Sequence, residues 1–132
     1  MGSVASTNPK RFQGQVVFIT GAAHGMGRAH ALAFARAGAN LVLCDACRQY
    51  STVPYPLAQP QELEELVTEI EQLGVAVVAA QVDVTQLAAM QNLVEQAEGT
   101  LGPIDIVVAN AGLYSFAPSW ELSEQQWDET IN

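Results

Sequence analysis

Three glycines follow Thr20 in a segment whose spacing suits the binding of phosphate groups. Gly21, Gly25 and Gly27 form the pattern G-x-x-x-G-x-G. In a turn from a strand into a helix, the first glycine permits a tight bend, the second lets a diphosphate approach the backbone, and the third lets the helix pack against the sheet. Free N–H groups and the dipole at the start of the helix favour negative charge. An ordinary glycine-rich turn is the alternative. The residues expected to contact the ligand are Thr20, Gly21, Ala23, His24, Gly25, Met26 and Gly27.

An acidic residue, Asp45, ends a second apolar run eighteen positions after Gly27. A carboxylate at this place can accept hydrogen bonds from the ribose hydroxyls of a dinucleotide. A 2′-phosphate at about 4 Å from it would be repelled by roughly several kcal/mol, so the sequence predicts NAD rather than NADP as the cofactor. The alternative is a solvated loop aspartate, and His24 or Arg28 could weaken the preference.

Two further strand ends carry candidate binding residues. Asp83 and Val84 follow a third apolar run, and Asn110, Ala111 and Gly112 follow a fourth. Because ligands bind at the carboxyl ends of parallel strands, we expect these side chains to meet at one edge of the sheet.

The only cysteines, Cys44 and Cys47, form one C-x-x-C pair. Such a pair can act in redox chemistry or supply half of a zinc site. The sequence has no second cysteine pair and no nearby histidine to complete a zinc site, so we predict no metal. A thioredoxin-like protein would need a helix beginning at the motif, but a proline-containing loop follows it.

The hydrophobic pattern predicts the elements that position these residues. Short apolar runs predict strands at 16–20, 40–44, 75–82 and 104–109. Helical periodicity predicts helices at 25–37, 63–73 and 86–99, the last with Thr85 as N-cap, and Ser123 with Gln126 forms a capping box that opens another. Residues 46–60 form a proline-containing loop. This alternation predicts an α/β fold with a doubly wound parallel sheet, the Rossmann fold, in an N-terminal portion of about four strands.

Composition narrows the classes of partner. The net charge is −9 with five basic residues, which argues against nucleic acid and anionic membranes. Apolar runs are far below the ~20 residues that cross a bilayer, and no secretory core follows the basic residues near the start. We therefore expect a cytoplasmic protein with a flexible N-terminus at residues 1–13 and one partial NAD-binding domain at residues 14–132.

Together these motifs resemble the short-chain dehydrogenase/reductase family. The family pattern is T-G-x-x-x-G-x-G, an acidic residue after strand two, D-V after strand three and N-A-G after strand four, all of which occur here between residues 15 and 132. The resemblance implies that Asp83 holds the adenine ring, that Val84 packs near it, and that Asn110, Ala111 and Gly112 stabilise the sheet beside the cofactor. It also implies oxidation of a secondary alcohol by hydride transfer to NAD.

The loop at 46–60 is similar to an insertion in the mycofactocin-coupled, carveol-dehydrogenase-like members of that family. Its sequence V-P-Y-P-L-A at 53–58 carries the resemblance. The resemblance implies that the loop covers NAD, which a separate mycofactocin-type redox partner then re-oxidises in place. A surface loop of arbitrary length is the alternative.

The family's general base lies in a Y-x-x-x-K motif, which this sequence does not contain. Asn132 matches the family's catalytic asparagine, so we expect a chain truncated before the catalytic Ser and Tyr and inactive alone. The resemblance implies a small-molecule alcohol or ketone as substrate, and the full-length form is expected to be a homo-oligomer. The alternative function is a non-catalytic NAD-binding module that pairs with another chain. The fourth strand is expected to have an open edge.

Overall fold

A parallel four-stranded sheet forms the centre of the protein. The computed structural model describes residues 10–113 and 117–131. The strands are β1 (Val16–Thr20), β2 (Asn40–Asp45), β3 (Val77–Gln81) and β4 (Ile106–Val108), in the order β3-β2-β1-β4. The helices are α2 (Gly25–Arg36), α3 (Pro60–Gln72), α4 (Leu87–Leu101) and α5 (Glu124–Ile131), with a short 3-10 helix at Ser119–Glu121. The predicted Rossmann-type alternation is confirmed.

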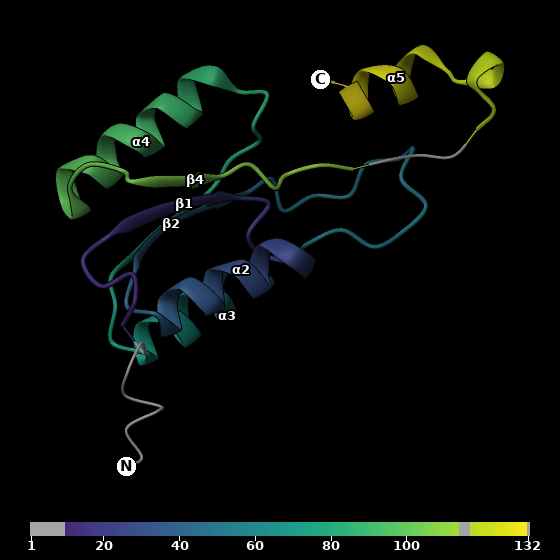
Figure 1. The fold of residues 1–132 in the computed structure, drawn as a ribbon. Coiled ribbons are helices and arrows are strands. Elements are labelled where there is room, and N and C mark those ends of the chain that lie inside the picture. The colour runs from purple at the N-terminus through teal and green to yellow at the C-terminus, as the bar shows by residue number, and fades with distance from the viewer. Residues whose placement is uncertain (1–9, 114–116, 132) are drawn as a thin grey trace.

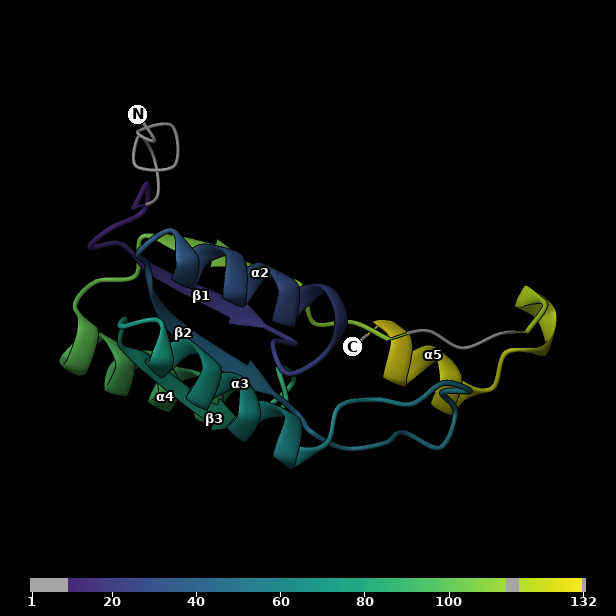
Figure 2. The same ribbon diagram turned by 90° about the horizontal axis from the view of Figure 1, so that it is seen from below.

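Helices cover both faces of this sheet, as Figures 1 and 2 show. Successive strand residues point to opposite faces, so each strand contributes to two cores. Val17 and Ile19 of β1 pack in the cluster that includes Leu66 of α3, whereas Val16 and Phe18 pack with residues of α4. The central strands β1 and β2 are therefore apolar almost throughout, which is typical of a parallel sheet buried on both sides.

Element boundaries differ from the predicted ones where local hydrogen bonds decide them. Helix α3 begins at Pro60 rather than at residue 63, because the Gln59 N–H donates to the Glu62 carboxylate at 3.3 Å and proline suits the first helical turn. Thr85 was wrongly predicted as the N-cap of α4; that position belongs to Gln86. The Thr85 hydroxyl instead donates to Asp83 at 2.7 Å. Strands β3 and β4 are shorter than the apolar runs that predicted them.

The residues just before β1 are part of the folded domain. Phe12 lies in the range 1–13 that was expected to be flexible, yet its ring packs against Phe34 with centroids 5.1 Å apart. Its N–H also donates to the Ala37 carbonyl at 2.8 Å. The start of the domain is therefore fastened to the end of α2.

Strand β4 forms one edge of the sheet. It pairs with β1 through Ile106, Val107 and Val108, and no described strand pairs with its other side. Val107 is 62% exposed. The expected open edge at the fourth strand is confirmed for the described residues. Within the same residues, no helix has the length and apolar character needed to span a membrane.

Candidate functional site: a cavity along the strand ends

The carboxyl ends of the strands open into a cavity of about 500 Å³. It lies between the turn after β1, the loop at residues 46–59 and the end of α5, which Figures 1 and 2 show gathered at one end of the sheet. The predicted site residues that line it are Gly21, His24, Met26, Asp45, Asp83, Val84, Asn110, Ala111 and Gly112. The predicted catalytic Asn132 lies outside the described residues.

Two glycines make the turn after β1 possible. Gly21 has φ +63, a conformation that favours glycine, and a Cβ there would meet the backbone of Ala111 at 2.8 Å. A Cβ on Gly27 would meet the Gly21 carbonyl oxygen at 2.1 Å. Helix α2 can therefore pack this close to the turn only because position 27 has no side chain.

Thr20 and Asn110 join this turn to the end of β4. The Thr20 hydroxyl oxygen accepts the backbone N–H groups of Asn110 and Ala111 at 3.1 and 3.0 Å. In return, the Asn110 side-chain amide donates to the carbonyls of Thr20 and Gly21 at 3.3 and 3.2 Å. Thr20 is 8% exposed. Both side chains therefore hold the cavity wall together. The family resemblance implied such a stabilising role for Asn110, whereas Thr20 was expected to contact the ligand.

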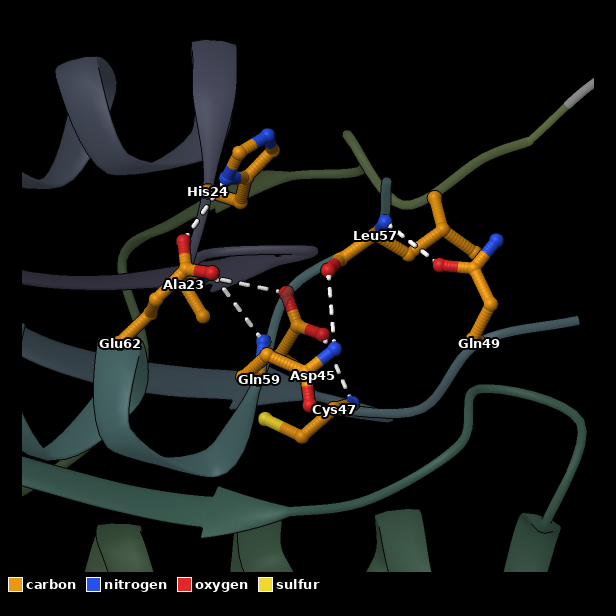
Figure 3. A network of polar contacts seen from close by, with 8 residues as sticks. All are labelled: Ala23, His24, Asp45, Cys47, Gln49, Leu57, Gln59 and Glu62. Atoms are coloured by element: carbon orange, nitrogen blue, oxygen red, sulfur yellow. Dashed lines mark hydrogen bonds and ion pairs between the residues drawn. The ribbon is translucent and has the colours of Figure 1, made fainter. Parts of the chain in front are cut away.

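Backbone groups fix the carboxylate of Asp45 at the end of β2. One oxygen accepts the Ala23 N–H at 3.1 Å and the other the Cys47 N–H at 2.9 Å, as Figure 3 shows. Cys47 has φ +52, which is uncommon for a residue other than glycine and marks a sharp change of chain direction. A carboxylate has about four lone-pair sites, so each oxygen keeps capacity for a ligand hydroxyl.

The basic side chains near the glycine turn are engaged with glutamates of α3. His24 Nδ1 lies 2.8 Å from the Glu62 carboxylate (Figure 3), and the Arg28 guanidinium donates to Glu69 at 2.7 Å. These contacts tie α2 to α3. Arg28 also has one buried nitrogen without a described partner. The two side chains that could weaken a preference for NAD, His24 and Arg28, are thus each engaged with a carboxylate.

Asp83, at the end of β3, receives donors on both carboxylate oxygens. One oxygen accepts the N–H and hydroxyl of Thr85 at 2.9 and 2.7 Å, and the other accepts the Tyr50 hydroxyl at 2.7 Å. Partial burial acts to raise the pKa of Asp83, but these hydrogen bonds and nearby Arg48 outweigh it and lower the pKa below its usual value. Asp83 is therefore an ionised acceptor at neutral pH. Burial and the bond to Asp83 raise the pKa of Tyr50.

The loop at residues 46–59 contributes cavity residues that sequence reasoning did not predict. Gln49 holds the loop together, because its side chain accepts the Leu57 N–H at 2.8 Å and donates to the Tyr55 carbonyl at 2.9 Å. The lining residues that the loop adds are Ala46, Arg48, Tyr50, Tyr55, Pro56, Leu57 and Ala58. The signals for them were a proline- and tyrosine-containing stretch directly after a predicted binding residue, and the resemblance of residues 53–58 to an insertion that covers NAD.

The same loop is fastened to α5. The Gln125 side chain donates to the Ser51 hydroxyl at 2.9 Å, and the Thr52 hydroxyl donates to Glu129. Glu129 and Ile131 also line the cavity. The loop and α5 therefore form one wall of the site, although they are far apart in the sequence.

The two cysteines face different surroundings. Both are free thiols, but Cys44 packs on the α4 side of the sheet and Cys47 on the side of α2 and α3. Burial, followed by the charge of Asp45, raises the pKa of Cys44 to about 11 and that of Cys47 to about 12. No group of three or more histidine, cysteine or acidic side chains suited to a metal occurs among the described residues.

Comparisons with known proteins agree with this geometry. The family model described as short chain dehydrogenase matches residues 15–132. An uncharacterized NAD-dependent oxidoreductase of Mycobacterium tuberculosis is 42% identical over 119 residues, which cover 89% of this chain and 43% of that protein. The (-)-trans-carveol dehydrogenase of Rhodococcus erythropolis is 37% identical over 92% of this chain and 44% of its own length.

Solved structures give the same result. A carveol dehydrogenase from Mycobacterium avium in complex with NAD superposes with a TM-score of 0.89 at 35% identity, over 92% of this chain and 44% of that one. A short chain dehydrogenase from Mycobacterium paratuberculosis bound to NAD has a TM-score of 0.87 at 36% identity, over 90% and 44%. The chain therefore spans less than half the length of these relatives. With the family model matched from residue 15 to residue 132, the chain belongs to the short-chain dehydrogenase family.

Proposed function

We propose that this chain binds NAD in the cavity along the strand ends and forms the cofactor-binding part of a dehydrogenase that oxidises an alcohol. The observation that carries the proposal is the carboxylate of Asp45, which backbone N–H groups hold beside the glycine turn. Two of the structurally similar relatives are NAD complexes. The cavity of about 500 Å³ runs past the ends of all four strands, as an extended dinucleotide requires.

The residues of the turn suit the diphosphate. Helix α2 has no acidic residue in its first turn, and the side chain of its N-cap residue, His24, does not cap the helix, so its first N–H groups remain available to an anion. The absence of a side chain at Gly27 keeps the turn in place. We assign the diphosphate to this helix end and the adenosine ribose to Asp45.

Asp45 also provides the basis for cofactor choice. Its carboxylate accepts ribose hydroxyls, whereas a 2′-phosphate at about 4 Å would be repelled by roughly several kcal/mol. His24 and Arg28 are paired with Glu62 and Glu69 and do not offset that repulsion. The cavity should therefore favour NAD over NADP.

The hydride transfer that we propose involves a Y-x-x-x-K motif in the family, and this sequence does not contain that motif. NAD, when bound, supplies an acceptor for the hydride of an alcohol. Asn110, Ala111 and Gly112 line the cavity at the end of β4. In the sheet, β1 separates β4 from β2 and β3, so we assign these three residues to the side of the cavity away from Asp45 and Asp83. The sequence lacks the family's Y-x-x-x-K, so we propose that the chain alone does not turn over an alcohol.

We further propose that the loop at residues 46–59 covers the bound cofactor and that re-oxidation uses a mycofactocin-type partner. The proposal is supported by the loop's bonds to itself through Gln49 and to α5 through Ser51 and Thr52. The retention of NAD through gel filtration, compared between the wild type and a chain lacking residues 50–57, tests the covering. Equal retention in both would contradict it.

The central experiment compares NAD and NADP binding by calorimetry in the wild type and in Asp45→Asn. NAD affinity should fall by about ten- to a hundredfold, since hydrogen bonds to charged groups contribute roughly 1.5–3 kcal/mol. The preference for NAD over NADP should shrink as the negative charge is lost. The control is Glu95→Gln, which removes an exposed carboxylate from α4 and changes the net charge equally. Absence of NAD binding to the folded wild type would refute the proposal.

A further inference from the structure

The strand order indicates where the adenine base of NAD would lie. This inference rests on the proposed NAD binding. If the diphosphate lies after β1 and the ribose after β2, the next strand outward in the order β3-β2-β1-β4 is β3. A base attached to that ribose therefore reaches the end of β3 and the loop segment that crosses it. The cavity there is lined by Ala46, Arg48, Tyr50, Val82, Asp83 and Val84.

Three of these side chains are already ordered relative to one another. The guanidinium carbon of Arg48 lies 4.3 Å from the centroid of the Tyr50 ring. The Tyr50 hydroxyl donates to Asp83 at 2.7 Å, and a guanidinium nitrogen of Arg48 lies 3.9 Å from the same carboxylate oxygen. The contact of Arg48 with the ring and the charge of Asp83 thus both hold the guanidinium over Tyr50.

The guanidinium leaves room for a second planar group. Tyr50 contacts it on one side, with the ring centroid 4.3 Å from the guanidinium carbon, while 62% of the Arg48 side chain is exposed and the residue lines the cavity. A guanidinium is flat and stacks on aromatic rings and nucleobases, which a lysine ammonium cannot do in the same way. Beside it, Asp83 offers an acceptor for an amino group at the edge of a base.

We propose that Arg48 is the stacking platform for the adenine base and that Tyr50 is a positioning residue, which holds Arg48 flat and Asp83 in place. Arg48 acts through its planar face rather than through its charge. The carboxylates of Asp45, Asp83 and Glu129 line the same cavity, so a single exposed cation there is a weak phosphate site.

The test distinguishes stacking on the planar guanidinium of Arg48 from the effect of its positive charge. Calorimetry with NAD on the whole chain compares Arg48→Ala and Arg48→Lys with the wild type, and both should weaken binding about tenfold. The control Arg36→Ala removes an exposed arginine at the opposite end of α2 and should bind as the wild type does. Far-UV circular dichroism and urea midpoints confirm that each variant folds.

Tyr50 is tested by a conservative pair. Tyr50→Phe keeps the ring beneath Arg48 and should lose only about threefold in NAD affinity, whereas Tyr50→Ala should lose about as much as Arg48→Ala. Unchanged binding by Arg48→Ala, or full rescue by Arg48→Lys, would overturn the stacking role while leaving NAD binding intact. Absence of NAD binding to the wild type would instead refute the proposed function on which this role rests.

Discussion

Substitution of Gly27 by alanine gives the most direct test of how the glycine turn is built. A Cβ at position 27 would lie 2.1 Å from the Gly21 carbonyl oxygen and 2.7 Å from the Asn110 side-chain nitrogen. Real Cβ contacts are essentially never shorter than 3.0 Å, so these atoms must separate by about 0.9 Å. The first of them is backbone and cannot rotate away. The turn, the start of α2 or both must therefore move.

The expected cost follows from two opposing effects. Overpacking at a close contact destabilises by about 1–3 kcal/mol, and a contact with backbone belongs in the upper half of that range. Alanine in a helix in turn stabilises by roughly 0.8–1.0 kcal/mol relative to glycine. We therefore expect Gly27→Ala to lower the free energy of unfolding by about 1–2 kcal/mol.

Gly99 provides a matched control because it also lies within a helix, α4, and nothing approaches its Cβ position within 4 Å. Gly99→Ala should stabilise the protein by roughly 0.5–1 kcal/mol. Urea unfolding followed by far-UV circular dichroism suits the comparison, since both tryptophans, Trp120 and Trp127, are exposed and report poorly on the core. A Gly27→Ala midpoint at or above that of the wild type would refute the steric argument.

Two further predictions concern titratable groups. Because the pKa of Asp83 is lowered on folding, its contribution to stability is present above its ordinary value of 3.8 and is lost as the pH falls through the lower folded value. Asp83→Asn should therefore lower the urea midpoint at pH 7, and the difference should shrink at pH 3; an equal difference at both would contradict the linkage. The thiols of Cys44 and Cys47, whose pKa values are raised to about 11 and 12, should react far more slowly with iodoacetamide at pH 8 in the folded chain than in urea. Equal rates in the two states, measured by mass spectrometry, would show that the thiols are accessible.

Most of the fold was predictable because its signals are local. Strand β1 and helix α2 begin where the sequence predicted, since a β-branched run and a glycine turn mark those points. The capping box at Ser123 and Gln126 forms both expected hydrogen bonds, at 3.0 Å each. The start of α3 was missed because glutamine is an unusual N-cap residue, although Glu62 three positions later, which accepts the Gln59 N–H, occupies the acidic position of a capping box.

The site likewise contains some residues that the sequence predicted and others that it did not. The strand-end residues Asp45 and Asp83 were predictable, because parallel strands must bring their carboxyl ends to one edge. The loop residues Arg48 and Tyr50 were not, because their roles depend on a partner that the sequence does not indicate. The Tyr50 hydroxyl donates a hydrogen bond to Asp83, which lies 33 positions later in the sequence.

The sequence by itself determined the order of elements, the glycine turn and the placement of an acidic residue, Asp45, at the end of a strand, since each depends on periodicity or backbone freedom along the chain. Only the tertiary structure decided which side chains support the cavity and which face into it. It made Thr20 a link between β1 and the residues after β4, and it joined Ser51 to Gln125 across 74 positions. Such contacts depend on the path of an irregular loop, which has no periodic pattern and takes its shape from the surfaces on which it packs.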